Sequence, residues 1–169
     1  AIVAGADIVN DISAGALDKR MIETVAALNV PYVLMHMKGT PQDMQQQAVY
    51  ENVTREVLDF LINKINEFRL AGIKDIIADP GLGFAKTIDH NFELLRNLSL
   101  FNITGCPVLL GISRKSFIYK TLGTTAANAL NGTTALHMMG LMHGASILRV
   151  HDVKEAVETV KLFSACRFS

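Results

Sequence analysis

Residues 107–119, "PVLLGISRKSFIY", contain the transition that decides the fold. An apolar run typical of a buried β-strand ends at Gly111 and Ile112, and four polar residues follow before the chain turns apolar again at Phe117. A strand that is apolar on both faces is typical of a parallel α/β sheet. Two cations and two hydroxyl groups at its carboxyl end indicate a binding site, because ligands bind at that end of such strands.

The same transition recurs along the chain. Short apolar runs predict five strands, at residues 7–12, 31–37, 75–79, 107–112 and 146–151. Between them lie helical patterns, such as the apolar positions that recur every three or four residues from Val53 to Phe68. Alternating strands and helices predict parallel strands with right-handed crossovers. The residue pattern leaves open a doubly wound sheet or part of a (β/α)8 barrel, since a barrel needs eight strands.

Local signals predict where several helices begin and end. Gly5, Gly72 and Gly144 each precede a predicted strand, where a preceding helix should end. Asp152 and Glu155 have the spacing of a capping box and predict the start of the last helix. That helix has one predicted apolar face, formed by Val153, Ala156, Val157 and Val160.

Length and composition narrow the class of protein. The chain has 169 residues, enough for a single domain over residues 1–169, with 16 basic and 16 acidic side chains. Scattered basic residues argue against a nucleic-acid partner, and no apolar run approaches the ~20 residues that span a bilayer. Cys106 and Cys166 match no metal or disulfide pattern, and no secretory signal is visible. We expect a cytoplasmic protein that acts on small molecules and, because it begins without methionine, is part of a longer chain.

Residues that a core would not choose follow every predicted strand at its carboxyl end. They are Asn10 and Asp11; Met35, His36 and Lys38; Asp79 with "PGLGF"; Ser113 to Ser116; and Arg149 and His151. The carboxyl ends of parallel strands meet at one side of the sheet, so these side chains are expected to share a site.

The predicted site has a cationic and an anionic part. Arg149 and His151 lie two residues apart and share one face of a strand, and Lys115 follows the neighbouring strand, which predicts an anion site for phosphate oxygens. Asp79 can accept paired N–H bonds from an amidine-like edge, and Asn10 can donate and accept there. With apolar Met35 and Phe84, the set predicts a pocket for a flat, nitrogen-rich heterocycle that carries a phosphate tail.

Each of these residues also has a structural interpretation. Asp79 could pair with Arg149 or Lys115 in a structural ion pair, and His36 on an apolar strand is more typical of a core histidine than of a catalyst. The remaining histidines, His90, His137 and His143, fall in or at the ends of helices, and no pair has zinc spacing with a third ligand nearby.

Five motifs together resemble the dihydropteroate synthase family. They are "NDIS", "LMHMKGTPQDMQ", "DPGLGFAK", "GISRKSF" and "RVHDVKEAV", in the order and spacing of the family and over essentially the whole chain. The resemblance implies a (β/α)8 barrel of which this chain holds about strands 4 to 8. It also implies the condensation of dihydropterin methyl diphosphate with 4-aminobenzoate to give dihydropteroate and diphosphate, a step of folate biosynthesis.

Matched motif by motif, the resemblance implies a role for each site residue. Asn10, Asp79 and Lys115 resemble the residues that hydrogen-bond the pterin ring, and Met35 and Gly111 resemble the lining of its pocket. Arg149 and His151 resemble the diphosphate site, and Arg149 also resembles the residue that covers the ring. Phe84, Ser116 and the stem of Lys115 resemble the 4-aminobenzoate pocket, where sulfonamides compete. The catalytic set implied is Asp79, Lys115, Arg149 and His151.

The chain departs from the family at its start. Three βα units precede "NDIS" in the family, and with them an asparagine that serves the diphosphate and Mg²⁺, an aspartate that helps to hold the pterin, and two mobile loops. The resemblance therefore implies Mg²⁺ with no ligand in this chain, and a homodimer in the full-length form. Ala85 stands where the family more often has glycine.

Two other functions stay open at this stage. One is a pterin-binding methyltransferase barrel, and the other is a non-catalytic fragment of the synthase. A five-stranded part of a barrel would expose two sheet edges, and we expect it either to associate with other chains or to be poorly behaved alone.

Overall fold

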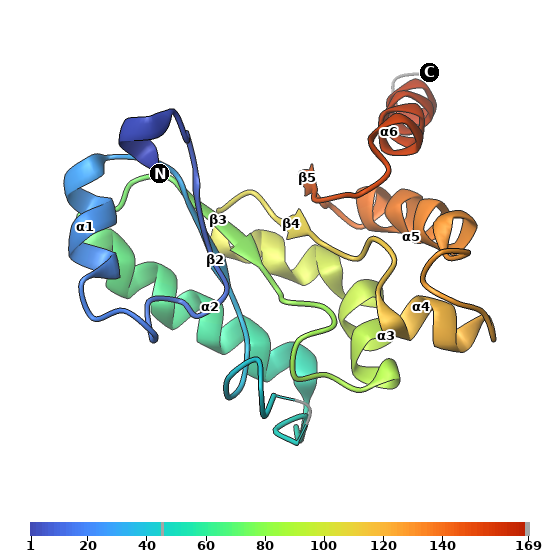
Figure 1. Ribbon diagram of the computed structural model, residues 1–169, viewed down its shortest axis with the longest axis horizontal. Helices are drawn as coiled ribbons and strands as arrows, with labels where there is room; N and C mark the ends of the chain where they lie inside the picture. The colour runs from blue at the N-terminus through green and yellow to red at the C-terminus, as the bar shows by residue number, and fades with distance from the viewer. Residues whose placement is uncertain (45, 168–169) are drawn as a thin grey trace.

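The computed structural model describes residues 1–44 and 46–167, so the last residue of "LMHMKGTPQDMQ" lies outside the described residues. Strands and helices alternate along the chain (Figure 1). The elements are η1 (Ile2–Ala4), β1 (Val9–Asp11), α1 (Met21–Leu28), β2 (Tyr32–Met35), α2 (Val53–Leu70), β3 (Ile76–Asp79), α3 (Ile88–Arg96), η2 (Leu98–Thr104), β4 (Leu109–Leu110), α4 (Ser116–Thr121), α5 (Leu130–Met142), β5 (Ile147–Leu148) and α6 (Val153–Arg167).

All five strands are parallel and lie in chain order. β1, β2 and β3 form one sheet, β4 pairs with β5, and a parallel bridge between Ala78 and Val108 joins β3 to the segment that leads into β4. A doubly wound sheet reverses its strand order at a switch point, and this order contains no reversal. The prediction of a parallel α/β fold is confirmed.

The strands are shorter than the sequence predicted. The predicted runs at 107–112 and 146–151 each contain a strand of only two residues, and those at 7–12 and 31–37 contain three and four. The apolar run continues beyond the last ladder hydrogen bond, because the chain leaves the sheet there to form the polar loops. The strand predicted at 75–79 is correct to within one residue.

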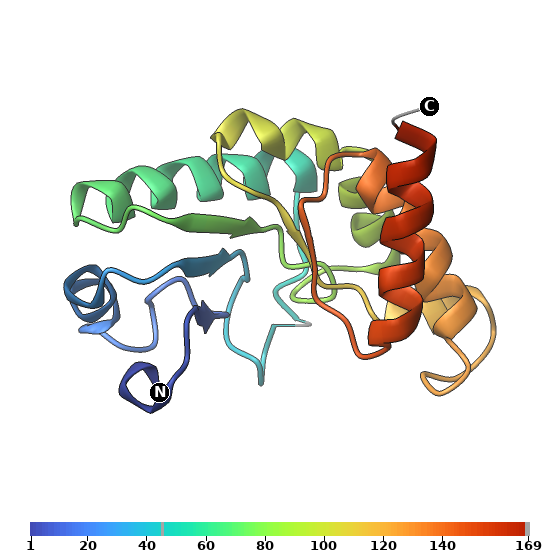
Figure 2. The ribbon, with the colours of Figure 1, turned by 90° about the horizontal axis from the view of Figure 1, so that it is seen from above.

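Side chains on the two faces of the strands pack differently. Tyr32, Leu34 and Ala78 face the main core, which α2, α3 and η2 cover on one side (Figure 2). The alternate residues point the other way, as the two-residue period of a strand requires. They form a small cluster of Val33, Ile77, Leu109 and Ile147.

The helix from Val53 to Leu70 confirms the predicted apolar stripe. Val53, Val57, Leu61, Ile65 and Phe68 are each at most 2% exposed. The helix begins after Asn52, whose side chain accepts a hydrogen bond from the Arg55 N–H. This stripe anchors the sheet to its helical layer.

The last helix differs from its prediction. It begins at Val153 as predicted, but the Asp152 carboxylate binds the Arg114 side chain instead of capping the helix backbone. Its apolar residues Val153, Val157 and Val160 are 63%, 46% and 41% exposed. They border an open groove of about 780 Å³ between α6 and the segment around β5.

The two outer strands each have one neighbour among the described residues. β1 pairs with β2 alone and β5 with β4 alone, which leaves two free sheet edges in the described part of the chain. No helix in residues 1–44 and 46–167 has the length and hydropathy of a membrane span.

Candidate active site

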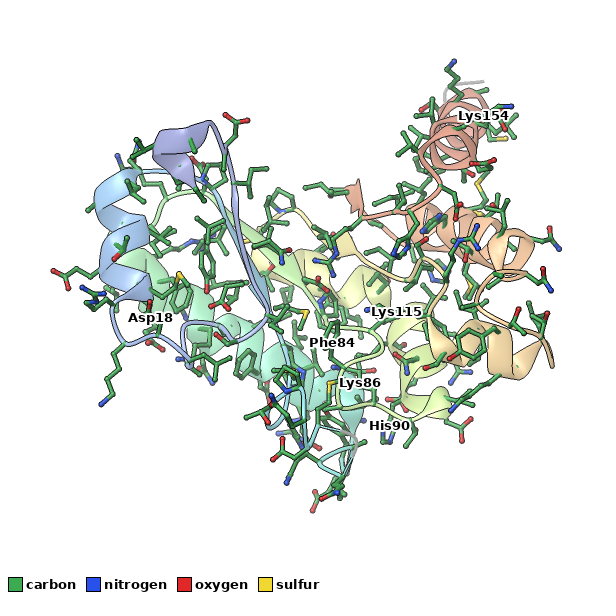
Figure 3. All side chains as sticks on the ribbon, in the orientation of Figure 1. Asp18, Phe84, Lys86, His90, Lys115 and Lys154 are labelled. Atoms are coloured by element: carbon green, nitrogen blue, oxygen red, sulfur yellow. The ribbon has the colours of Figure 1, made fainter. Side chains whose placement is uncertain are left out.

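A cavity of about 300 Å³ lies at the carboxyl ends of the strands. It brings together side chains from four of the five predicted segments. Figure 3 labels two of its lining residues, Phe84 and Lys115. Its lining consists of Asn10, Ile12, Phe84, Gly111, Ser113, Lys115, Arg149, Val150 and His151. Six of these nine residues were given a role in the site from the sequence; Ser113 was expected there only as one of the strand-end residues, and Ile12 and Val150 were not predicted.

Asp79 ends β3 directly beside this cavity and is 1% exposed. The N–H of Gly81 donates to its Oδ1 at 2.8 Å. Its Oδ2 lies 3.1 Å from Nη2 of Arg149, an ion pair without hydrogen-bond geometry, so this oxygen has no hydrogen-bond partner among the described residues. Burial raises the pKa of Asp79, and the charge of Arg149 and the Gly81 N–H oppose that rise.

Arg149 links the two sides of the pocket. Its Nη1 donates to Asn10 Oδ1 at 2.7 Å, while Nη2 faces Asp79. A Cβ at Gly111 would lie 2.5 Å from Nη2, so the guanidinium needs a glycine beneath it. The ion pair between Asp79 and Arg149 that the sequence left open is therefore present in the structure.

Lys115 reaches over the loop that follows β3. Its Nζ donates to the carbonyl of Leu82 and lies 4.4 Å from the centroid of the Phe84 ring. Burial lowers the pKa of Lys115 to about 8, although Asp79 opposes this shift. A Cβ at Gly83 would lie 2.6 Å from Lys115 Cδ, so the lysine also needs a glycine at its side.

His151 is held by a serine that is 5% exposed. Ser113 Oγ lies 3.0 Å from His151 Nδ1 and accepts from the His151 main-chain N–H at 3.2 Å. This arrangement orients the imidazole at the cavity wall, next to Arg149.

The two cations of "SRKS" point in different directions. Arg114 has a φ of 55° and donates from Nε and Nη2 to Asp152, at 2.8 and 2.7 Å. Its Nη1 donates to the carbonyls of Ala126 and Ala127. The pair with Arg114 lowers the pKa of Asp152. Lys115 therefore serves the pocket, whereas Arg114 ties the start of α6 to the loop before α5.

Three predicted site residues, Met35, Asp79 and Ser116, lie outside the cavity lining, and Asp79 reaches it only through Arg149. Met35 is 1% exposed and packs beside Gly81. Ser116 is exposed at the first turn of α4, one residue beyond Lys115. A strand end or a motif neighbour can lie near a site without facing it, because the turn between the elements sets the direction of each side chain.

The histidine and cysteine interpretations agree with the geometry. His36 is 3% exposed, and burial lowers its pKa to about 2. His90 forms a capping box with Thr87, and His143 Nδ1 lies 3.0 Å from the carbonyl of Leu95. Cys106 and Cys166 are both free thiols. No group of three or more potential metal ligands occurs within the described ranges.

Comparison with known proteins gives consistent matches. The family model for pterin binding enzymes matches residues 1–151. The dihydropteroate synthases of Haemophilus influenzae and Escherichia coli K12 are 42% and 39% identical to the chain over 163 residues, which cover 95% of it. The chain spans only 59% and 57% of those two proteins.

Solved structures agree with these matches. Dihydropteroate synthase from Thermus thermophilus in complex with 6HMPPP superposes with a TM-score of 0.92 at 37% identity, over 97% of this chain and 66% of that one. The Yersinia pestis enzyme in a sulfonamide drug complex gives a TM-score of 0.95 at 36% identity, over 99% and 61%. The resemblance indicated by the five motifs is confirmed.

Proposed function

The chain belongs to the family of pterin-binding enzymes, and we propose that it carries the pterin and diphosphate sites of a dihydropteroate synthase. Such an enzyme joins dihydropterin methyl diphosphate to 4-aminobenzoate, releasing diphosphate and forming dihydropteroate for folate biosynthesis. The observation that supports the proposal most strongly is that Lys115, Arg149 and His151 line one small cavity, while the buried Asp79 carboxylate pairs with Arg149 just behind that lining.

In this proposal the pterin ring binds through the Asp79 carboxylate and the Asn10 side-chain amide. Asp79 Oδ2 has a free lone pair, and Asn10 Oδ1 lies on the other side of the same guanidinium. The planar N–C–N unit of Arg149 occupies the place where the aminopyrimidine edge of a pterin would pair. In the proposed complex the ring replaces this unit, and Arg149 moves to cover the ring and meet the diphosphate.

The proposed chemistry needs stabilised charges more than an acid or a base. The bond between the methyl carbon and the diphosphate oxygen breaks, and its electron pair leaves with the diphosphate beside Arg149 and His151. Asp79 stabilises the electron-poor pterin that remains. The arylamine nitrogen then forms the new C–N bond and loses a proton to water. By analogy with oxyanion donors, loss of one such contact would cost about 2.7–4 kcal/mol of transition-state stabilisation.

The second substrate would lie against Phe84. The Phe84 ring and the stem of Lys115 form one wall of the cavity, and exposed Ser116 stands just outside its mouth in this proposal. Structures of relatives include one with 4-aminobenzoate and one with a sulfonamide drug. We extend both ligand classes to this chain as part of the proposal.

Magnesium enters the proposal through the family alone. The Asp79 carboxylate already meets Arg149 and the Gly81 N–H, Asp152 already binds Arg114, and the described residues offer no group of three metal ligands. These residues do not fit a complete Mg²⁺ site, so its ligand is expected outside this chain, and no step here depends on it.

The architecture proposed is strands 4 to 8 of a (β/α)8 barrel. Parallel strands in chain order, two free edges and coverage of 59% of a relative support an incomplete domain over residues 1–169. The complete protein would be a cytoplasmic homodimer.

The direct test compares Asp79→Asn with His151→Ala in titration calorimetry against a non-phosphorylated pterin. Asp79 meets the ring and His151 only the tail, so we expect a loss of affinity of about 10–100-fold for the first and almost none for the second. A Lys120→Ala variant, changed on the exposed side of α4, should bind like the unmodified chain. Equal losses in the two pocket variants would contradict the assignment.

Activity separates the remaining functions. Product formation should appear when the first three βα units of a synthase are supplied as a separate chain. No turnover under any complementation would favour a non-catalytic fragment. Retention of methyltetrahydrofolate but not of dihydropterin diphosphate would favour a methyltransferase barrel.

A further inference from the structure

Lys86 is a buried lysine that the proposed reaction does not use. It lies two residues beyond Phe84, is 4% exposed, and does not line the cavity. Figure 3 places it beside Phe84, on the side away from Lys115. An ionisable amine is rarely buried this far without partners, so its contacts are informative.

The ammonium group has a partner for each of its N–H bonds. A protonated lysine has three donors and no acceptor. Lys86 Nζ lies 3.0 Å from the carbonyl oxygens of Gly81 and Phe84 and 3.1 Å from His36 Nδ1. The first two acceptors lie at opposite ends of the loop at residues 81–84, and the third lies just beyond β2.

His36 serves as the fixed acceptor in this set. Since a charged lysine can only donate, His36 Nδ1 must carry its lone pair, and the ring proton lies on Nε2. Burial and the charges of Lys86 and Lys38 lower the pKa of His36 to about 2, so the ring stays neutral. Its plane is nearly perpendicular to that of the Phe60 ring, 4.9 Å away between centroids, which fixes its orientation.

The loop that Lys86 binds carries much of the pocket. The N–H of Gly81 holds Asp79 Oδ1, the carbonyl of Leu82 accepts from Lys115, and Phe84 forms the wall beneath Lys115. Gly81 and Gly83 have φ values of 68° and 84°, which few other residues adopt. A loop in this conformation depends on its hydrogen bonds to keep one shape.

We infer that Lys86 is a positioning residue of the pterin site, whose buried ammonium ties both ends of the 81–84 loop to His36. This inference deepens the proposed function and rests on it for the identity of the ligand. The loop's geometry, however, can be measured without any ligand.

The charge of Lys86 gives the inference a pH signature. Burial lowers its pKa to about 7; Asp79 opposes the shift, while Lys115 and Lys38 add to it, and neutral His36 faces it from just beyond β2. Above that pH the neutral amine has two N–H donors and a lone pair, so the carbonyls of Gly81 and Phe84 lose charge-assisted hydrogen bonds, and the contact to His36 persists only if the imidazole proton moves to Nδ1. The 81–84 loop is then held less firmly, and ring affinity should fall. The free energy of unfolding should instead rise with pH between about pH 7 and 10. In that range the unfolded chain, whose lysine has a pKa near 10.5, binds more protons than the folded chain.

The test combines hydrogen exchange with ligand titration in a Lys86→Met variant, which keeps the apolar stem and removes the donors. We expect exchange at the Gly81 and Gly83 amides to rise about tenfold, with amides of α2 unchanged, and pterin affinity to fall by about the same factor. The affinity of the unmodified chain should fall as pH rises through the pKa of Lys86, about 7, and this fall should be smaller in the variant. Lys120→Met, on the exposed side of α4, is the matched control.

The outcomes separate this inference from the proposed function. Unchanged loop exchange in Lys86→Met, or an unchanged pH step, would overturn the positioning role. Failure of the unmodified chain to bind a pterin would overturn the proposed function, while the exchange result would still decide the role of Lys86. If the variant does not fold, NMR titration of the unmodified chain decides: the Gly81 and Gly83 amide signals must follow the midpoint of Lys86 Cε, and independent midpoints would overturn the inference.

Discussion

The two halves of the sheet differ in how completely they are covered. Every residue of β2 and β3 is buried, whereas both residues of β5 are only half-buried. The apolar stripe of α2 is at most 2% exposed, but Val153 and Val157 on α6 are 63% and 46% exposed. The centre of the sheet, β2 to β4, therefore has a finished core, whereas β5 and α6 present apolar surface that the described residues do not cover.

The pocket is divided between these halves. Asp79 and Phe84 come from the first, and Arg149 and His151 from the second. Between β3 and β4 the ladder is reduced to the bridge at Ala78, and the ion pair of Asp79 with Arg149 spans the same junction. The site's geometry thus depends on this junction, where the ladder is shortest although one hydrophobic core runs across it.

The largest expected effect comes from breaking the finished core. Phe68→Ala removes a fully buried ring that packs edge-on against Tyr32 and should lower the free energy of unfolding by about 3–5 kcal/mol. Val157→Ala, on half-exposed α6, should change it by about 0.5 kcal/mol or less. Urea unfolding of both variants measures the contrast, and similar losses would show that the two halves contribute alike.

A smaller effect is expected from disturbing the ion pair between Asp79 and Arg149. Gly111→Ala would place a Cβ against the Arg149 guanidinium and push it from Asp79, an overpacking change of about 1–3 kcal/mol. Without its cation, Asp79 should show a pKa raised further above 3.8, because desolvation would then act with less opposition. An NMR titration of the Asp79 carboxyl carbon measures this. A pKa equal to that of the unmodified chain would mean that Arg149 does not act on Asp79.

The smallest effect is expected from removing the contacts of Arg114 that hold the start of α6. Arg114→Ala removes the contacts to Asp152, Ala126 and Ala127 and should increase hydrogen exchange at the start of α6 while leaving α2 unchanged. The pKa of Asp152 is lowered, so its stabilising contribution is present above about pH 3.8 and is lost as pH falls below that value. The stability difference between the unmodified chain and the variant should therefore shrink in acid. Lys154→Ala, at an 82% exposed side chain, is the control.

Much of this arrangement is predictable from the sequence because periodicity reports burial directly. The α2 stripe ending at Phe68, the parallel strands and the polar strand ends all follow from residue pattern. Five lining residues, Asn10, Phe84, Lys115, Arg149 and His151, were predicted because strand ends must converge, and Gly111 through the family resemblance alone. The same reasoning cannot set the direction of each side chain, which is why Asp79, Met35 and Ser116 were predicted for the site and lie outside the lining.

Lys86 shows what pattern cannot reveal. A lysine two residues beyond Phe84, after a glycine-rich turn, is most simply interpreted as exposed. Its burial depends on two carbonyl groups and a histidine brought together by the backbone of residues 81–84, where Gly81 and Gly83 have positive φ. The one available signal was its place at the end of "DPGLGFAK".

The Arg149 guanidinium already occupies the position between Asp79 and Asn10 that a ligand would need. A molecule that pairs with the Asp79 carboxylate must displace this guanidinium. Its measured binding free energy is therefore the difference between the contacts that the ligand gains and the contacts that Arg149 loses. A small anion that binds beside His151 and attracts the Arg149 guanidinium would free the Asp79 carboxylate. Such an anion should strengthen the binding of a neutral ring without contacting that ring.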